Sequence, residues 1–264
     1  MTFGNPHKFP FHSCNDNELK QLDINYSTTK VQPIVGPINE TPLHCSLQVS
    51  QDDNDDTDGF LPANFPNCNS YSVVEFQNIA LTNSFNIFHA NVNGLENKID
   101  DIHEFLANSK TLMDVIAFTE TSLQSSNEFF SNNVTNENYV EFSTPSNSRK
   151  GGTSIFVKNS FNVIERQDLK IINDHFESVW VDIKGNSEKN IICGSIYRHP
   201  HDILNIFNDF VEYMEKTLLT IARENKEIFI CGDFNCDLRK AQTNKNYARF
   251  YEMLSSFNLF PSIN

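Results

Sequence analysis

The chain has 264 residues, a formal net charge of −14 at pH 7, 39% hydrophobic residues and 23 phenylalanines. This length and composition support one sizeable domain with additional segments. The acidity argues against a basic surface that would hold nucleic acid by charge alone. No apolar run approaches the roughly 20 residues of a membrane span, and the N-terminus lacks the order of a signal peptide. We therefore expect an intracellular protein, in the nucleus or cytoplasm, that does not enter a membrane.

The six cysteines fit a reducing compartment. They form no CxxC motif and show no His/Cys zinc spacing. Cys193 and Cys231 lie inside apolar, strand-like runs, where we expect buried thiols rather than disulfides.

Residues 1–83 differ in composition from the rest of the chain. They are rich in Asn, Asp, Ser, Thr and Pro and show no sustained period. The acidic cluster around Gly59 resembles a calcium-binding loop, but the template requires an acid at the first position and a glutamate at the twelfth. The chain has Asn54 and Phe65 there. We predict that 1–83 form a disordered, polar and acidic N-terminal segment.

From residue 84 onward the pattern becomes regular, and residues 84–264 are predicted to form one domain. Strands are predicted at 85–92, 114–120, 151–158, 177–183, 190–197 and in the apolar run 228–231. Helices are predicted at 96–108, from a cap at Asp202 to Ile221, and at 247–257, with a long Ser- and Asn-rich loop at 124–150. Many strands with a few interspersed helices indicate an α+β sandwich.

Polar residues follow four of these strands. Asn91, Glu120 and Tyr197 each stand at the end of one, and Asp233 and Asn235 follow the last. If the strands are neighbours, their ends bring two carboxylates, two amides and a phenol together. Hard oxygen ligands suit Mg²⁺ or Mn²⁺. A carboxylate-held divalent ion with amide donors and a tyrosine is suited to hydrolysing a phosphodiester.

Each of these residues also has a simpler interpretation. Glu120 could be a solvated strand terminus, Asn91 and Asn93 could be turn residues before Gly94, and Tyr197 could be an aromatic at the edge of the core. Only their joint order favours a site.

The histidines carry less information. His199 and His201 flank a proline and look like a metal pair, but we interpret them as loop residues. His103 and His175 have no second candidate ligand at a recognisable spacing in the sequence.

From about Phe85 to its end, the chain resembles the DNase-like endonuclease/exonuclease/phosphatase family, and within it the endonuclease domain of LINE-type (non-LTR) retrotransposons. The segments that carry the resemblance are "NVNGLENKIDDIHEFL", "DVIAFTETSL", "GGTSIFVK", "SIYRHP" and "FICGDFNCDL". The continuation "CDLRKAQ" differs from the aromatic-Arg pattern of the family's phosphoinositide phosphatases.

The resemblance implies a four-layer α/β/β/α sandwich and Mg²⁺-dependent hydrolysis of one DNA strand, which leaves a 3′-hydroxyl to prime reverse transcription. It implies that Glu120, Asn91 and Asp233 bind the metal. Asp233 would orient or deprotonate water or assist the leaving group, and Asn235 and Tyr197 would contact the phosphate. DNA is then the expected partner, and no small-molecule cofactor is expected.

The chain departs from the family pattern at its C-terminus. The family carries a "SxIDHI"-like segment whose Asp and His complete the site, whereas only 29 residues follow Asn235 and none of them is His. We therefore expect a domain that is incomplete at the C-terminus and an endonuclease that is weak or inactive. The alternatives are a small-molecule phosphoesterase of the same superfamily and a non-catalytic binding protein that keeps the fold.

Overall fold

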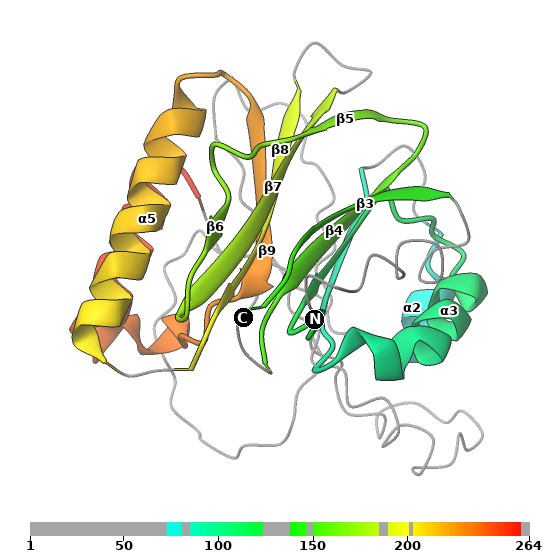
Figure 1. Ribbon diagram of the computed structural model, residues 1–264, viewed down its shortest axis with the longest axis horizontal. Coiled ribbons are helices and arrows are strands. Elements are labelled where there is room, and N and C mark those ends of the chain that lie inside the picture. The colour runs from blue at the N-terminus through cyan, green and yellow to red at the C-terminus, as the bar shows by residue number, and fades with distance from the viewer. Residues whose placement is uncertain are drawn as a thin grey trace.

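The structure is a computed structural model that describes residues 73–80, 85–123, 138–146, 150–184, 190–200 and 203–259. In these ranges, two β-sheets pack face to face, and helices cover the outer face of each sheet (Figure 1). The layers follow the order helix, sheet, sheet, helix. The four-layer α/β/β/α sandwich predicted from the sequence is therefore confirmed.

The first sheet has four strands in the order β1-β2-β4-β3. Their bounds are β1 Ile87–Asn91, β2 Val115–Thr119, β4 Thr153–Lys158 and β3 Tyr139–Thr144. Strands β1 and β2 are parallel, and the other pairs are antiparallel. A parallel pair needs a crossover, which is formed here by the 3₁₀ helix η2 (Leu95–Lys98) and helix α3 (Ile99–Asn108).

The second sheet has the strand order β5-β7-β8-β9, and β6 also pairs with β7. Their bounds are β5 Asn162–Glu165, β7 Phe176–Lys184, β8 Ile191–Arg198, β9 Glu227–Asp233 and β6 Ile171–Ile172. Strands β8 and β9 are parallel and are joined by the long helix α5 (Leu204–Ala222). The 3₁₀ helix η3 (Leu238–Gln242) and helix α6 (Lys245–Ser256) follow β9.

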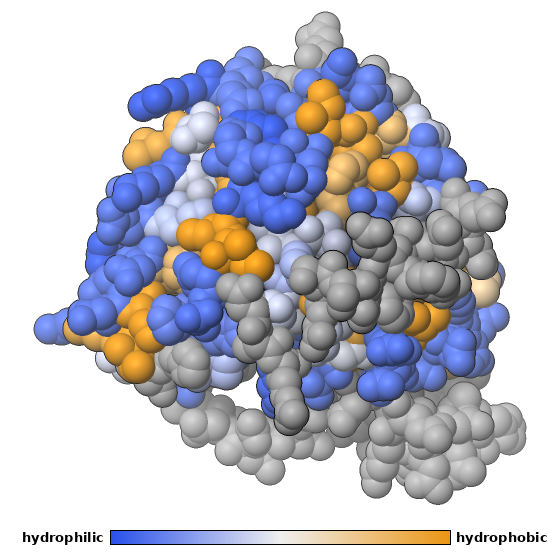
Figure 2. Space-filling model, viewed as in Figure 1, coloured by the Kyte–Doolittle hydropathy of each residue, from blue (hydrophilic) through white to orange (hydrophobic). Residues whose placement is uncertain are grey.

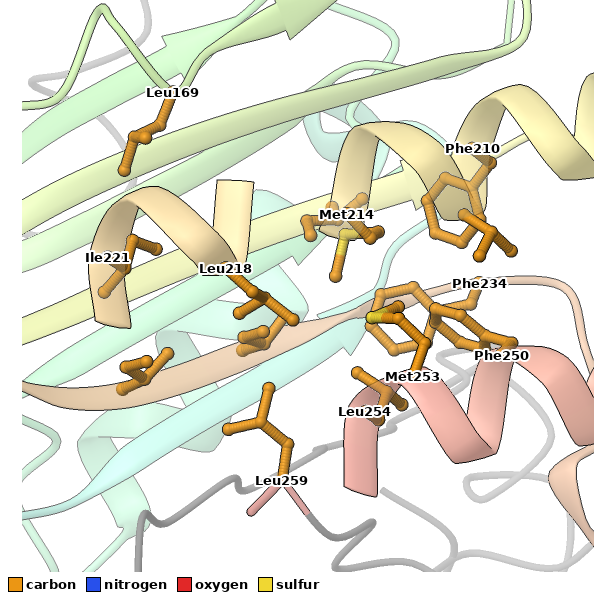
Figure 3. Packing of buried hydrophobic residues seen from close by; sticks show 14 of the residues in the cluster. Leu169, Phe210, Met214, Leu218, Ile221, Phe234, Phe250, Met253, Leu254 and Leu259 are labelled. Carbon is orange, nitrogen blue, oxygen red and sulfur yellow. The ribbon is translucent and has the colours of Figure 1, made fainter. Parts of the chain in front are cut away.

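Helices α5 and α6 bury their apolar stripes against the outer face of the second sheet (Figure 3). Met214 and Leu218 of α5 and Phe250 of α6 are fully buried there. Phe234, directly after β9, joins them with its ring 5.7 Å from that of Phe250. This contact fixes the chain just beyond β9, where the candidate site begins.

The layer between the two sheets changes from apolar to polar along the strands. Its centre is made of fully buried apolar side chains such as Ala117, Ile155 and Cys193. One step further along the strands, the hydroxyls of Thr153 and Ser195 meet across the sheets in a hydrogen bond. Beyond them lie the polar strand ends of both sheets. The gradient therefore joins the sheets through an apolar centre and places polar groups at one edge.

Helix α2 (Val73–Asn78) lies within the range 1–83 that was predicted to be disordered. Its Phe76 is only 3% exposed and stacks on Phe105 of α3, with ring centroids 5.5 Å apart. The disorder prediction is therefore wrong for residues 73–80, because Phe76 and Ile79 pack this segment against the cluster that contains Phe105 of α3. The remaining part of that range lies outside the described residues.

Two further predictions need correction. The range 124–150 was predicted to be a loop, but Tyr139–Thr144 form strand β3, which pairs along its whole length with β4. The segment 96–108 contains a 3₁₀ turn before α3 begins at Ile99, rather than one continuous helix.

The long helix α5 begins at Leu204, and its N-cap residue is Ile203, which makes no side-chain cap hydrogen bond. The predicted cap residue, Asp202, lies outside the described residues. The exposed large apolar side chains, including Leu112, Ile164 and Leu219, are distributed over several segments of the described chain. On the face seen in Figure 2, orange residues accordingly form separate patches among blue ones. Across the described ranges, no helix is both long enough and apolar enough to cross a membrane.

Candidate active site

The core of the site is one amide that joins two carboxylates from different sheets. Asn91 ends β1, and its Nδ2 donates to Glu120 Oε1 at 2.8 Å and to Asp233 Oδ2 at 2.9 Å. Glu120 directly follows β2, whereas Asp233 ends β9 in the other sheet. The structure therefore brings together three residues that are up to 142 positions apart in sequence.

Tyr197 lies beside this group near the end of β8. It pairs with Asp233 in the β8–β9 register, so both side chains project from the same face of the sheet. The residue is only 2% exposed. Burial raises the pKa of the Tyr197 phenol, and the negative charge of the nearby Glu120 carboxylate raises that pKa further. The phenol therefore keeps its proton at neutral pH and acts as a donor.

Two residues around the end of β9, Gly232 and Asn235, have backbone conformations that few residue types adopt readily. Gly232 has φ +154°, and a Cβ added there would clash with the carbonyl oxygen of Ile196 in β8. Asn235 lies in the left-handed region, with φ 46°, and its N–H donates to Asp233 Oδ1 at 3.0 Å. Asparagine is one of the few side chains that adopt this conformation readily.

The side chain of Asn235 is not placed by strand alternation, because the strand ends at Asp233. Its Nδ2 donates to the carbonyl oxygen of Arg198 at 2.6 Å. An amide nitrogen has two N–H groups, so one donor remains in addition to this main-chain contact. The phosphate-binding role implied for Asn235 stays a prediction.

Arg198 is a supporting residue that sequence reasoning missed. It is 1% exposed, and its guanidinium donates to the carbonyl oxygens of Phe234, at 2.6 Å, and Asn235, at 2.5 Å. Its Cζ lies 5.0 Å from the ring centroid of Phe207 and 5.9 Å from that of Phe210, both in α5. One buried cation therefore ties the turn that carries Asp233 and Asn235 to β8 and α5. The sequence feature that could have indicated this role is the position of Arg198 directly after the predicted site residue Tyr197.

The electrostatics of the site favour proton uptake at Asp233. Burial raises the pKa of its carboxyl, and the nearby Glu120 carboxylate acts in the same direction. The hydrogen bonds from the Asn235 N–H and the Asn91 amide, together with the charge of Arg198, oppose this shift only in part. The result is a carboxylate that accepts a proton more readily than a solvated aspartate.

The donor set fits a small, hard divalent cation. No three His, Cys, Asp or Glu side chains gather into a metal cage within the described ranges. Glu120 and Asp233 nevertheless approach the same amide group, and the negative charge between them is only partly compensated. Mg²⁺ is commonly held by one or two carboxylates while it keeps several waters. These two residues are therefore suitable ligands.

Two residues beside Tyr197 were not predicted as part of the site. Glu177 pairs with Tyr197 across β7 and β8, and His199 contacts the Tyr197 ring edge-on at 4.9 Å. His199 was interpreted as a loop residue, yet it is only 7% exposed and its side chain points inward. His201 lies outside the described residues.

Comparisons with known proteins were made for the whole chain. A model described as "Endonuclease/Exonuclease/phosphatase family" matches residues 84–258, a range that includes every site residue named above. No curated protein matches the chain by sequence.

Several solved structures are similar in fold. The endonuclease domain of TRAS1, a telomere-specific non-LTR retrotransposon, has a TM-score of 0.46 and 15% identity over 66% of this chain and 71% of that chain. TDP2 of D. rerio, complexed with single-strand DNA product, has a TM-score of 0.44 and 16% identity over 61% and 65%. The 3′ phosphatase NExo from Neisseria, bound to a product DNA hairpin, has a TM-score of 0.44 and 12% identity over 66% and 71%.

Proposed function

Since the chain belongs to the endonuclease/exonuclease/phosphatase family, whose model matches residues 84–258, we propose that it hydrolyses DNA phosphodiester bonds with a divalent metal ion. The observation that carries this proposal is the contact of one amide, that of Asn91, with carboxylates from both sheets. The resemblance of its motifs to retrotransposon endonucleases favours nicking of one DNA strand as the reaction.

Each residue has a role that follows from its contacts. Glu120 and Asp233 would hold Mg²⁺ or Mn²⁺, which supplies positive charge to phosphate oxygens when bound. Tyr197 keeps its proton and donates to a non-bridging oxygen, and the remaining N–H of Asn235 does the same. Asn91 fixes the two carboxylates relative to one another.

The proton transfer is assigned to Asp233. Its carboxylate takes a proton from water as the water oxygen bonds to phosphorus and the bond to the 3′ oxygen breaks. The 3′ oxygen takes up a proton from solvent water and leaves as a hydroxyl, while the phosphate stays on the 5′ side.

The test is nicking of supercoiled plasmid by the purified 264-residue chain, with Mg²⁺, with Mn²⁺ and with EDTA. Asp233→Asn should lower the rate at least about 100-fold, as expected when a general base is lost, and Glu120→Gln should abolish the response to metal. Asp182→Asn is the matched control, because this carboxylate lies at the other end of the second sheet, bonded to Lys226. Nicking that survives Asp233→Asn would refute the assignment.

A second candidate function is hydrolysis of small phosphoesters. The net charge of −14 favours it, because an acidic protein gains little from the charge of a DNA duplex. Release of phosphate from inositol phosphates, or cleavage of bis(p-nitrophenyl) phosphate, without plasmid nicking would select this function. Absence of both reactions would select a non-catalytic binding role.

A further inference from the structure

Three side chains form a row across the site end of the second sheet. Glu177 of β7 pairs with Tyr197 of β8, and Tyr197 pairs with Asp233 of β9. Residues paired across neighbouring strands project from the same face of a sheet. Glu177 therefore flanks Tyr197 on the side opposite Asp233 and faces the same interior.

Glu177 is a buried acid, only 1% exposed. Its Oε1 lies 3.2 Å from His199 Nε2 and accepts a hydrogen bond from Ser146 Oγ at 3.3 Å. Its Oε2 is buried and has no hydrogen-bond partner within the described residues. A carboxylate in this position is expensive to bury, since only one of its two oxygens is satisfied.

The backbone packs closely over this pair. A Cβ added to Gly151, whose φ is +124°, would lie 2.7 Å from Glu177 Oε1 and 3.1 Å from His199 Cε1. Only a residue without a side chain lets the chain approach Glu177 and His199 so closely. The pair is therefore enclosed by the sheet on one side and by the turn at Gly151 on the other.

The Glu177–His199 pair is connected to the candidate site by the contact between the His199 and Tyr197 rings. The His199 ring meets the Tyr197 ring edge-to-face, with centroids 4.9 Å apart and planes at 65°. The Tyr197 phenol in turn lies near the Glu120 carboxylate. Contacts thus run from Glu177 through His199 to Tyr197, which lies beside the carboxylate that is expected to hold the metal.

A buried acid–histidine pair is a poor device for stability, because apolar side chains of similar volume usually serve as well or better. Such a pair does fix the direction of the imidazole ring. We infer that Glu177 and His199 are positioning residues, which hold the Tyr197 ring so that its phenol points at Glu120 and the scissile phosphate. The catalytic consequence rests on the proposed function, whereas the effect on Tyr197 does not.

The kinetic test replaces the pair by apolar residues. In the Glu177→Leu/His199→Leu double variant, kcat for plasmid nicking should fall about 10- to 100-fold, as expected when a reacting group is displaced. KM should stay within about 3-fold, since the residues that meet the phosphate remain. Glu177→Gln alone should lower kcat in the same direction. Asp182→Asn, a control on the same strand, should leave kcat unchanged.

A second readout does not depend on catalysis. The chain is labelled with 3-fluorotyrosine, and the ¹⁹F signal of Tyr197 is identified from its loss in Tyr197→Phe. The Glu177→Gln variant keeps both rings in place but weakens the hold on His199. We expect one narrow Tyr197 signal in the wild type and a broadened or split signal in Glu177→Gln.

The outcomes separate the two proposals. If the wild-type chain does not nick DNA, the proposed function fails, and the fluorine spectra alone decide the role of the pair. A single narrow Tyr197 signal in Glu177→Gln, or an unchanged kcat in a folded double variant, would show that the pair only fills space. A kcat loss together with a disordered Tyr197 signal supports the inference.

Discussion

Replacing Arg198 by methionine should both destabilise the fold and loosen the turn that carries Asp233. Arg198 donates to two main-chain carbonyls, those of Phe234 and Asn235. A hydrogen bond from a charged donor contributes about 1.5–3 kcal/mol, so the two together contribute about 3–6 kcal/mol. Methionine keeps contact with Phe207 and removes a buried charge, which offsets part of this loss. We therefore expect the free energy of unfolding to fall by about 2–4 kcal/mol.

Thermal unfolding measures the first effect. For a domain of this size, 1 kcal/mol corresponds to about 2–4 °C, so the Tm of Arg198→Met should fall by about 5–15 °C. Arg198→Lys should restore only part of the loss, because an ammonium lacks the planar fork that reaches both carbonyls. Nicking by Arg198→Met, measured well below its Tm, should fall at least about 10-fold, since Asp233 loses its anchored turn.

The control is Arg166→Met. Arg166 also uses its guanidinium in two interactions, with Asp168 and Glu224, but these lie near the C-terminal end of α5, away from the site. This variant should lower the Tm without changing the nicking rate. An Arg198→Met protein with the Tm of the wild type, or with full activity, would refute the reasoning that Arg198 holds the turn.

Three further predictions follow from single contacts. In EDTA, the Tm of Asp233→Asn relative to the wild type should rise between pH 4 and pH 7: burial raises the folded-state pKa of Asp233, so the stability that its protonated form contributes to the wild type is complete below about pH 4 and is lost as the pH rises. A Tm gain of the same size at pH 4 and pH 7 would contradict this. Phe76→Ala should cost about 3–5 kcal/mol in urea unfolding, and an unchanged midpoint would show that α2 does not stabilise the domain. In the same assay, Gly232→Ala should lower the free energy of unfolding by at least about 2 kcal/mol more than Gly94→Ala. Both glycines have positive φ, but only the substitution at Gly232 clashes with a neighbouring strand. Equal losses of free energy would exclude the clash.

Much of the fold could be predicted because its strands and its longest helix carry strong periodic patterns. Strand β8 is buried along its whole length and is mostly apolar in sequence, and α5 buries the stripe from Phe207 to Ile221. Strand β3 was missed because its residues, apart from Thr144, are only partly buried and lie in a Ser- and Asn-rich context. Strand β6 was missed because it has only two residues, Ile171 and Ile172, too few to show an alternating pattern.

The site was partly predictable because the apolar strands that lead to it are recognisable in the sequence. Polar residues that end apolar strands are visible in sequence, so Asn91, Glu120 and Asp233 could be grouped before their contacts were known. Arg198 and Glu177 could not be grouped in this way. A buried charge is recognisable only from the carbonyls or side chains that surround it, and those belong to other strands.

The meeting of Asn91 with Asp233 has a consequence for the order in which the protein matures. Glu120 and Asn91 belong to one sheet and Asp233 to the other, so neither sheet alone contains the set. A folding intermediate with only one sheet formed would lack the complete set, and the proposed activity would require both sheets to dock. A cation that binds only the docked form would stabilise it by RT ln(1 + [M]/Kd). A divalent cation would then stabilise the docked stage of folding, in addition to any role in the proposed reaction.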